Sequence, residues 1–244
     1  MRFSQRGFLH TVRFSHGSEV MNSRRRPKNE NSRPPPLGHR SVVTPPSPFT
    51  AGTDTLAAGT TLCRVHSNRR TANQFNPGFG APTRFAFFGT PTVPILYAAA
   101  TEDAAICETL LHDVPFAGGD LRPRSYETTV ASTIAPTRPL RLAALLGTGL
   151  RQLGVAASEV TETEADRYPD TVKWAETAHG AGFDGLVYMS RRCNSDRVYA
   201  LFGDRVTEAD LEVQADYGRV FTLGADRDWL IDFCAPLRVN VLVL

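Results

Sequence analysis

The sequence lacks most features that mark metal-binding, membrane and secreted proteins. Its four cysteines lie far apart, with no C-x-x-C pair and no histidine at zinc-ligand spacing. A reduced, cytoplasmic protein without a structural metal is therefore expected. We also expect no bound cofactor. No apolar run approaches the roughly 20 residues that span a bilayer, and the first residues lack the apolar core of a secretory signal. We therefore expect no membrane segment.

The common catalytic motifs are also missing. There is no G-x-S-x-G elbow, no H-E-x-x-H helix and no P-loop, which removes the usual hydrolase, zinc-protease and nucleotide-triphosphatase assignments. The Gly-x-Gly of NPGFGAP is not followed by a helical pattern, so it is not a dinucleotide-binding fingerprint.

Lysine is scarce as well, with 25 Arg against 2 Lys, and the positive charge is concentrated at the start of the chain. The first 50 residues carry eight Arg and one Lys against two Glu, so the remaining sequence is acidic and direct nucleic-acid binding is not expected. Residues 1–55 are also rich in Pro and Ser, and we predict a disordered basic tail. A nucleic-acid-binding arm and a mitochondrial transit peptide are the less favoured alternatives. Residues 56–244 are predicted to form one domain.

Strands and helices alternate irregularly over that domain, which favours an α+β fold with a mixed, mainly antiparallel sheet and flanking helices. In TLCRVHS the alternation predicts a strand with Arg64 and His66 on the face opposite Cys63 and Val65. Further strands are predicted at 84–88, around LVYMS before Ser190, and in SYETTVASTIAP, RPLRLAALLG and RVYALFGDRV. Short helices are predicted within 147–165, and a longer helix over 168–180.

The segment Leu96–Asp113 contains the most informative pattern, a short apolar strand followed by a helix that Thr101 caps. At 100° per residue, Glu102, Thr109 and Asp113 share one arc, which predicts the solvent face. Glu108 lies away from that arc and is expected to point inward. An inward carboxylate is usually paired, hydrogen-bonded or functional, so a structural ion pair with an arginine and a catalytic role are both open.

Four segments together resemble the RES domain family, named for an Arg, a Glu and a Ser. They are LCRVH with Arg64, TRFAFFGT with Arg84, ILYAAATEDAAICETLLH with Tyr97 and Glu108, and GFDGLVYMSRR with Ser190. The resemblance covers about residues 58–206. It implies a fold related to ADP-ribosyltransferases and a toxin-like activity that breaks the nicotinamide–ribose bond of NAD+ by hydrolysis or phosphorolysis. It also implies a helix-turn-helix antitoxin as partner and leaves a homodimer open.

The resemblance implies that Glu108, Arg64 and Ser190 are catalytic, and that Arg84, Tyr97 and Arg192 bind substrate. His66 is a further candidate for substrate binding, only because of its position beside Arg64. The chemistry suits them, because one carboxylate can stabilise an oxocarbenium-like ribose and guanidinium groups can hold a pyrophosphate. Ser190 would bind the ribose or orient Glu108. Most of these residues also have an ordinary structural explanation: an ion pair with an inward acid for Arg64 or Arg84, core packing for Tyr97, a turn for Ser190 and a satisfied polar group for His66.

Two further functional classes stay open at this stage. A transferase that attaches ADP-ribose to a protein would use the same residues, because only the acceptor differs. A non-enzymatic interaction module on a RES-like scaffold is the second class, and the presence of Arg64, Tyr97, Glu108 and Ser190 together argues against it.

Overall fold

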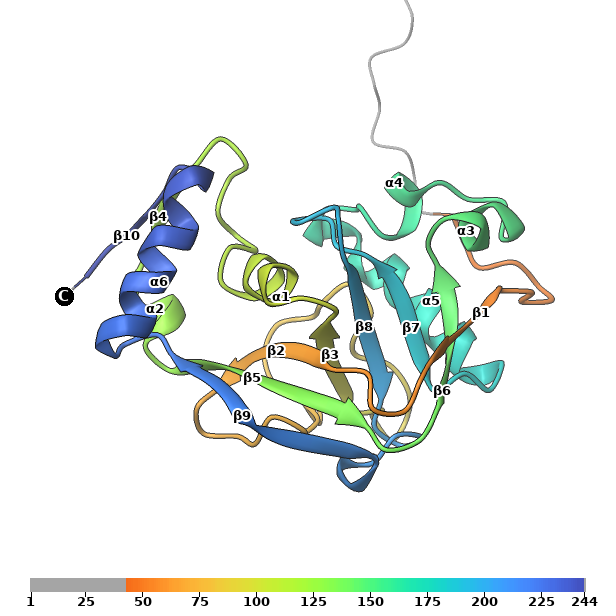
Figure 1. Cartoon of the computed structure of the whole chain (residues 1–244). Helices are drawn as coiled ribbons and strands as arrows, with labels where there is room; N and C mark the ends of the chain where they lie inside the picture. Colours follow the sequence, from red (N-terminus) through yellow and green to blue (C-terminus); the bar gives the residue numbers. More distant parts are fainter. Residues whose placement is uncertain (1–42, 244) are drawn as a thin grey trace, which may run out of the picture. The chain divides into compact units, whose positions relative to one another are not determined.

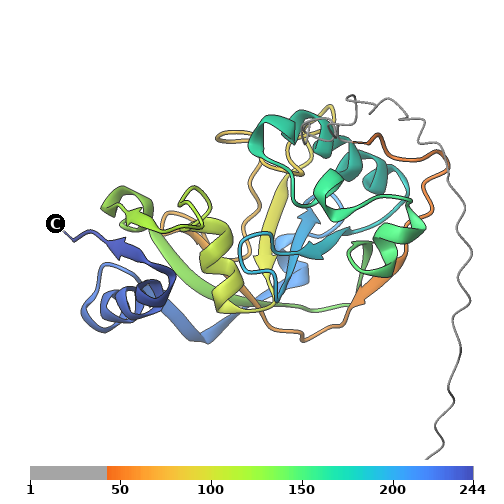
Figure 2. The same ribbon diagram turned by 90° about the horizontal axis from the view of Figure 1, so that it is seen from above.

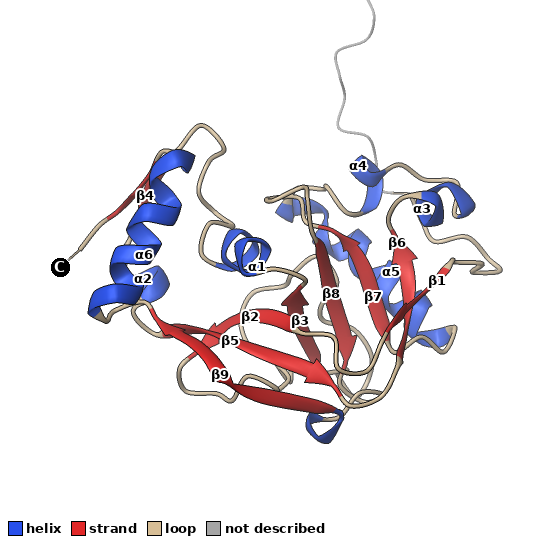
Figure 3. Cartoon of the chain, viewed as in Figure 1, coloured by secondary structure: helices blue, strands red, loops and turns tan. Residues whose placement is uncertain are grey.

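The computed structural model describes residues 43–243, and these form a mixed α+β domain built on one large curled sheet (Figures 1 and 3). The sheet has eight strands in the order β1-β6-β7-β8-β3-β2-β5-β9, and every neighbouring pair is antiparallel except β6–β7. This confirms the predicted fold class. The strands are β1 (Thr53–Leu56), β2 (Leu62–Ser67), β3 (Ile95–Ala99), β5 (Thr129–Pro136), β6 (Leu140–Leu145), β7 (Gly185–Met189), β8 (Arg197–Phe202) and β9 (Leu211–Val220).

Six α-helices accompany the sheet in the described part of the chain. They are α1 (Glu102–Thr109), α2 (Pro123–Tyr126), α3 (Thr148–Gln152), α4 (Ala157–Val160), α5 (Tyr168–Gly180) and α6 (Gly224–Cys234). Figures 1 and 2 show α6 at one end of the domain and α3 to α5 at the other. Beside α6, β4 (Gly119–Leu121) pairs in parallel with β10 (Val239–Val241).

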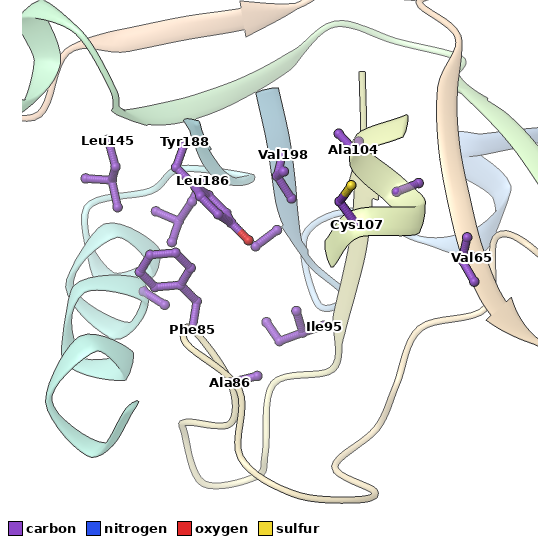
Figure 4. Close-up of a cluster of buried hydrophobic side chains, with 14 of the residues drawn as sticks. Val65, Phe85, Ala86, Ile95, Ala104, Cys107, Leu145, Leu186, Tyr188 and Val198 are labelled. Atoms are coloured by element: carbon purple, nitrogen blue, oxygen red, sulfur yellow. The ribbon is translucent and has the colours of Figure 1, made fainter. Parts of the chain in front are cut away.

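Strand alternation separates the core into two layers, one on each face of the sheet. In β3, Ile95 and Ala99 belong to the cluster that contains α1 and α5, whereas Leu96 and Ala98 belong to the cluster on the other face. Figure 4 shows part of the first cluster, with residues of α1, β3, β7 and β8, and with Phe85 beside Tyr188. No helix in residues 43–243 has the length and apolar character needed to cross a membrane.

The predicted C-terminal boundary of the disordered tail, at residue 55, is wrong. The indole Nε1 of the buried Trp174 donates to the carbonyl of Val43 at 2.9 Å, and Phe49 packs edge-on against the same ring. Residues 53–56 then pair with β6 as β1. Residues 43–55 therefore belong to the packed domain, because a few apolar residues within the polar segment find buried partners on α5 and β6. The rest of the predicted tail lies outside the described residues.

Helix α1 begins as predicted, with the Thr101 hydroxyl accepting from the Ala104 amide at 3.2 Å. Its predicted solvent face is wrong at Glu102. That carboxylate accepts from Arg219 Nε at 2.6 Å and from the Tyr217 hydroxyl, because β9 passes beside the first turn of the helix. Arg219 also lies over the Trp229 ring of α6, at 3.9 Å from the ring centroid. The start of α1 is thus tied to both β9 and α6.

Candidate active site

A cavity lies where β2 and β3 separate. Their ladder contains a single pair, Cys63 with Ala99, and the backbone of Ile95 pairs instead with Asn76 from the connecting loop. The resulting cleft has a volume of about 780 Å³, within the range of small-molecule sites. It is lined by β2, β3, the end of α1, the loop before β3 and the start of α5. Five of the seven predicted site residues line it: Arg64, His66, Arg84, Tyr97 and Glu108.

Glu108 is half-buried in the last turn of α1 and contributes a carboxylate to the cleft wall. Its Oε1 accepts from Ser190 Oγ at 2.6 Å and from the Arg192 amide at 3.2 Å. Within residues 43–243 no arginine, lysine or histidine lies within ion-pair distance of it. The structural ion pair left open by the sequence is therefore not formed, and the carboxylate is oriented by neutral donors.

Ser190 follows β7 and is only 1% exposed. Besides donating to Glu108, its hydroxyl accepts from the Cys193 amide at 2.9 Å, and its own amide donates to the Asp196 carbonyl at 2.8 Å. The turn after β7 thereby fixes the hydroxyl in one orientation. Ser190 is not among the residues that line the cleft, so it touches the cleft through Glu108.

Arg64 is a buried cation on β2. Its guanidinium donates to the carbonyls of Ala72 and of Gln74, the latter at 2.9 Å, and it forms no ion pair with a carboxylate in the described chain. Burial, together with the nearby charge of Arg70, lowers the pKa of Arg64 to about 10, so it stays protonated at neutral pH. A buried cation held only by carbonyl groups keeps its positive charge available for an anionic ligand.

Arg84 is also buried, but the predicted strand at 84–88 is wrong. Thr83 and Ala86 close a tight turn through two backbone hydrogen bonds, of 2.9 and 3.3 Å, and Phe85 fills the core from that turn. The apolar run reflects burial rather than a strand, so Arg64 and Arg84 do not come from neighbouring strands. Arg84 donates to the Thr163 carbonyl at 2.8 Å and to its hydroxyl at 2.6 Å. In the described residues it has no carboxylate partner either.

Tyr97 of β3 holds the turn that carries Arg84. Its hydroxyl accepts from the Phe85 amide at 3.2 Å and lies 2.9 Å from the Thr83 hydroxyl. Burial raises the pKa of Tyr97 to about 12, so the phenol stays protonated. The ring also lines the cleft, so the structure gives Tyr97 a structural contact in addition to access to a ligand.

His66 lines the cleft with both ring nitrogens satisfied. Nδ1 donates to the Ser67 carbonyl at 3.0 Å, which leaves Nε2 of the neutral ring to accept from the Ser132 hydroxyl at 3.0 Å. Burial is the largest cause that lowers the pKa of His66, and the charge of Arg64 lowers it further. The ring is therefore neutral at pH 7. These contacts correspond to the structural alternative for His66, a polar side chain with its hydrogen bonds satisfied.

The lowered pKa of His66 predicts a pH dependence of stability. Between the folded pKa and the ordinary value of about 6.5, the unfolded chain binds more protons, so the free energy of unfolding should fall as the pH drops below about 6.5. One such group contributes at most about 1.4 kcal/mol per pH unit. Urea unfolding of wild type and His66→Gln at pH 7.5 and 5.5 measures this change in the free energy of unfolding. A pH dependence that is equal in the two proteins would contradict the assignment.

The Arg192 side chain does not reach the cleft, so its predicted contact with substrate is not supported by the geometry. Its guanidinium donates to the Val114 carbonyl at 3.2 Å and lies 4.8 Å from the centroid of the Phe116 ring. Only the backbone amide approaches the cleft wall, through Glu108. The turn after Ser190 directs the side chain toward the loop that follows α1, which the sequence could not indicate.

Several lining residues were not identified from the sequence. Tyr188 lies two residues before Ser190 on β7, and the two-residue period of a strand could have placed it on the same face. Burial, and next the charge of Glu108, raises the pKa of Tyr188 well above its ordinary value. The ring of Tyr168 lies beneath the Arg84 guanidinium, at 5.3 Å, and only the tertiary structure brings the two together. Further ionisable side chains that line the cleft are Arg69 and Arg70 after β2, and His112 and Asp113 after α1.

Comparison with known proteins identifies one family. The family model described as the RES domain matches residues 61–223. Among solved structures, a chain in the crystal structure of the M. tuberculosis MbcT–MbcA toxin–antitoxin complex aligns with 14% sequence identity and a TM-score of 0.48, covering 68% of this chain and 85% of that one. No curated protein sequence matches. No group of three or more His, Cys, Asp or Glu residues in the described chain is arranged to hold a metal ion.

Proposed function

Because the chain belongs to the RES domain family, we propose that it consumes NAD+ by breaking the bond between nicotinamide and ribose. The observation that carries this proposal is the carboxylate of Glu108, which is fixed by Ser190 in the wall of a cleft that also contains Arg64 and Arg84. Two buried cations suit a pyrophosphate, and an oriented carboxylate suits a developing positive charge.

In the proposed reaction the bond between C1″ of the ribose and N1 of nicotinamide breaks and its electron pair passes to the pyridinium ring, so that nicotinamide leaves as a neutral molecule. No general acid is needed for this leaving group. The ribose develops oxocarbenium character, and Glu108 opposes that charge from the α1 side of the cleft. An oxygen of water or phosphate then forms the new bond at C1″ and loses its proton to solvent or to the carboxylate.

Pyrophosphate binding is assigned to Arg64 and Arg84. Guanidinium groups bind phosphate oxygens in a bidentate manner, and both are already immobilised by backbone carbonyls, which lowers the entropy lost on binding. Tyr97, Tyr168 and Tyr188 give the cleft aromatic surface on which a nicotinamide or ribose ring can pack.

Mass spectrometry of the small-molecule products tests the proposal. Purified protein is incubated with NAD+ in buffers with and without phosphate, and a Glu108→Gln preparation serves as the control for contaminating activity. Nicotinamide with ADP-ribose indicates hydrolysis, whereas ADP-ribose 1″-phosphate that forms only with phosphate indicates phosphorolysis. Label from adenine-tagged NAD+ on a macromolecule would favour a protein-directed transferase. Folded, partner-free protein that leaves NAD+ intact would favour a binding module.

A toxin-like role with an antitoxin partner is part of the proposal, as family membership suggests. A helix-turn-helix protein encoded by an adjacent gene is the expected partner. Such a partner should suppress NAD+ loss when it is added in equal amount, and co-expression should restore growth to cells that the chain alone arrests. Growth arrest that persists in the Glu108→Gln variant would separate toxicity from NAD+ consumption.

The contacts of Ser190 predict a positioning role. Ser190→Ala removes the donor to Glu108, and a hydrogen bond to a charged group contributes about 1.5–3 kcal/mol, so kcat should fall roughly tenfold or more with little change in KM. The free energy of unfolding should fall by about 1–3 kcal/mol, because the Cys193 amide loses its acceptor.

The matched control for this prediction is Ser195→Ala, in the same turn. The Ser195 hydroxyl is exposed and bonds only to the neighbouring Asp196 and Cys193 side chains. In steady-state kinetics, kcat and KM of this variant should be close to those of wild type. An equal loss of kcat in both variants would indicate a general effect of the turn rather than positioning of Glu108.

A further inference from the structure

A second cavity, of about 280 Å³, lies on another face of the segment that carries Glu108. Cys107 and Leu111 line it, whereas Glu108 and His112 line the cleft, as expected for neighbouring faces of a helical segment. Its other walls are the loop at 114–116 and residues 236–239, which precede and begin β10. Figure 1 shows α6, β4 and β10 beside α1 at this end of the domain. Residues 236–239 lie beyond the match to the RES domain, so the cavity depends on the C-terminal segment.

The cavity combines an apolar lining with two arginines. Phe116 and Leu237, two of its apolar lining residues, are 69% and 41% exposed. Arg192 packs on the Phe116 ring, and Arg238 from the C-terminal segment also lines the cavity. No acidic residue lines the cavity, and neither arginine forms an ion pair within residues 43–243.

We propose that this cavity binds a small apolar molecule that carries one carboxylate or phosphate group. The volume suits a ligand of about one aromatic ring, below the size of a nucleotide, and the exposed Phe116 and Leu237 offer it apolar contact. The two guanidinium groups offer an anion charge-assisted hydrogen bonds, and the absence of a lining carboxylate leaves that charge uncompensated at the site. A neutral or cationic analogue would forgo this interaction.

The position of the cavity connects it to the cleft. Cys107 directly precedes Glu108, and the backbone amide of Arg192 donates to Glu108 Oε1. A ligand that orders Arg192 would therefore also order a donor of the carboxylate. This step alone rests on the proposed function, whereas binding to the cavity does not.

Isothermal titration calorimetry with the full chain tests the proposal. Phenylacetate and phenyl phosphate are the probes, and phenylacetamide is the uncharged analogue of phenylacetate. We expect saturable binding of at least one anion at a single site, with the amide at least tenfold weaker. Arg238→Gln should weaken the anion at least fivefold, and Phe116→Ala should weaken both the anion and any residual amide binding.

Two control variants define the site. Arg151→Gln removes an exposed arginine of α3, at the other end of the domain, and should bind the probes as wild type does. Arg64→Gln removes a cation of the large cleft and should also leave probe binding unchanged. Loss of binding in Arg64→Gln would place the anion in the cleft and overturn the proposal.

Three other results would overturn it: equal affinity for phenylacetate and phenylacetamide, unchanged affinity in Arg238→Gln, and no heat of binding for either anion up to about 10 mM. Binding of phenylacetate but not of phenyl phosphate would identify the ligand's anionic group as a carboxylate. Binding of phenyl phosphate but not of phenylacetate would identify it as a phosphate. Since these titrations contain no NAD+, their outcome does not depend on whether the chain consumes it.

Discussion

Glu108→Gln is expected to lower NAD+ turnover by about 10²–10³-fold while the melting temperature stays close to wild type. The amide keeps an oxygen that can accept from Ser190 Oγ and from the Arg192 amide, so the local hydrogen bonds can be maintained. The glutamine lacks the negative charge that opposes the ribose cation. Removal of one oriented electrostatic group of this kind typically lowers turnover by about 10²–10³-fold. A discontinuous assay of nicotinamide release, with thermal unfolding of the same samples, measures both effects.

The matched control for this substitution is Glu212→Gln, an exposed glutamate of β9. It should retain full turnover. Glu108→Gln protein with wild-type turnover and an unchanged melting curve would refute the catalytic assignment. A large drop in melting temperature would show instead that the carboxylate is structural, which the absence of an ion pair in the described chain argues against.

Arg64→Ala is expected to weaken NAD+ binding by roughly tenfold to a hundredfold. Hydrogen bonds between a cation and a phosphate contribute about 1.5–3 kcal/mol, and 1.4 kcal/mol corresponds to a factor of ten in affinity. Calorimetry in the Glu108→Gln background avoids consumption of NAD+ during the titration. Arg151→Ala is the control, since that arginine is exposed on α3 and does not line the cleft.

Truncation of Arg64 also leaves the carbonyls of Ala72 and Gln74 without a donor, so some loss of stability is expected. Arg64→Lys separates the two effects, because it keeps the charge but not the planar fork that binds two phosphate oxygens. Partial affinity in the lysine variant would support a bidentate contact. Wild-type affinity in the folded alanine variant would remove Arg64 from the binding site.

Family membership and fold do not by themselves decide the chemistry, because one fold supports several activities. The placement of Glu108, Arg64 and Arg84 around one cleft is the more specific observation. The acceptor, whether water, phosphate or a protein side chain, depends on what enters the cleft opposite Glu108, and product analysis decides it.

Local patterns in the sequence predicted those elements that depend on periodicity and capping. The helix over 168–180 begins and ends where expected, and Thr101 caps α1. In β2 the alternation correctly separated Cys63 and Val65, which pack with the α1 layer, from Arg64, which bonds the loop at 72–74. These features follow from the 3.6-residue and two-residue periods, which neighbouring residues alone determine.

The tertiary structure decided which partner each side chain meets. Glu108 is oriented by a hydroxyl 82 residues away, and Glu102 leaves its predicted solvent face because β9, more than 100 residues later, supplies Arg219. The same applies to the turn at 83–86, which carries strand-like residues but is held by Tyr97, and to Arg192, whose side chain leaves the cleft. A local pattern fixes the direction of a side chain relative to its own element. The contacts it makes depend on segments that only the folded chain brings together.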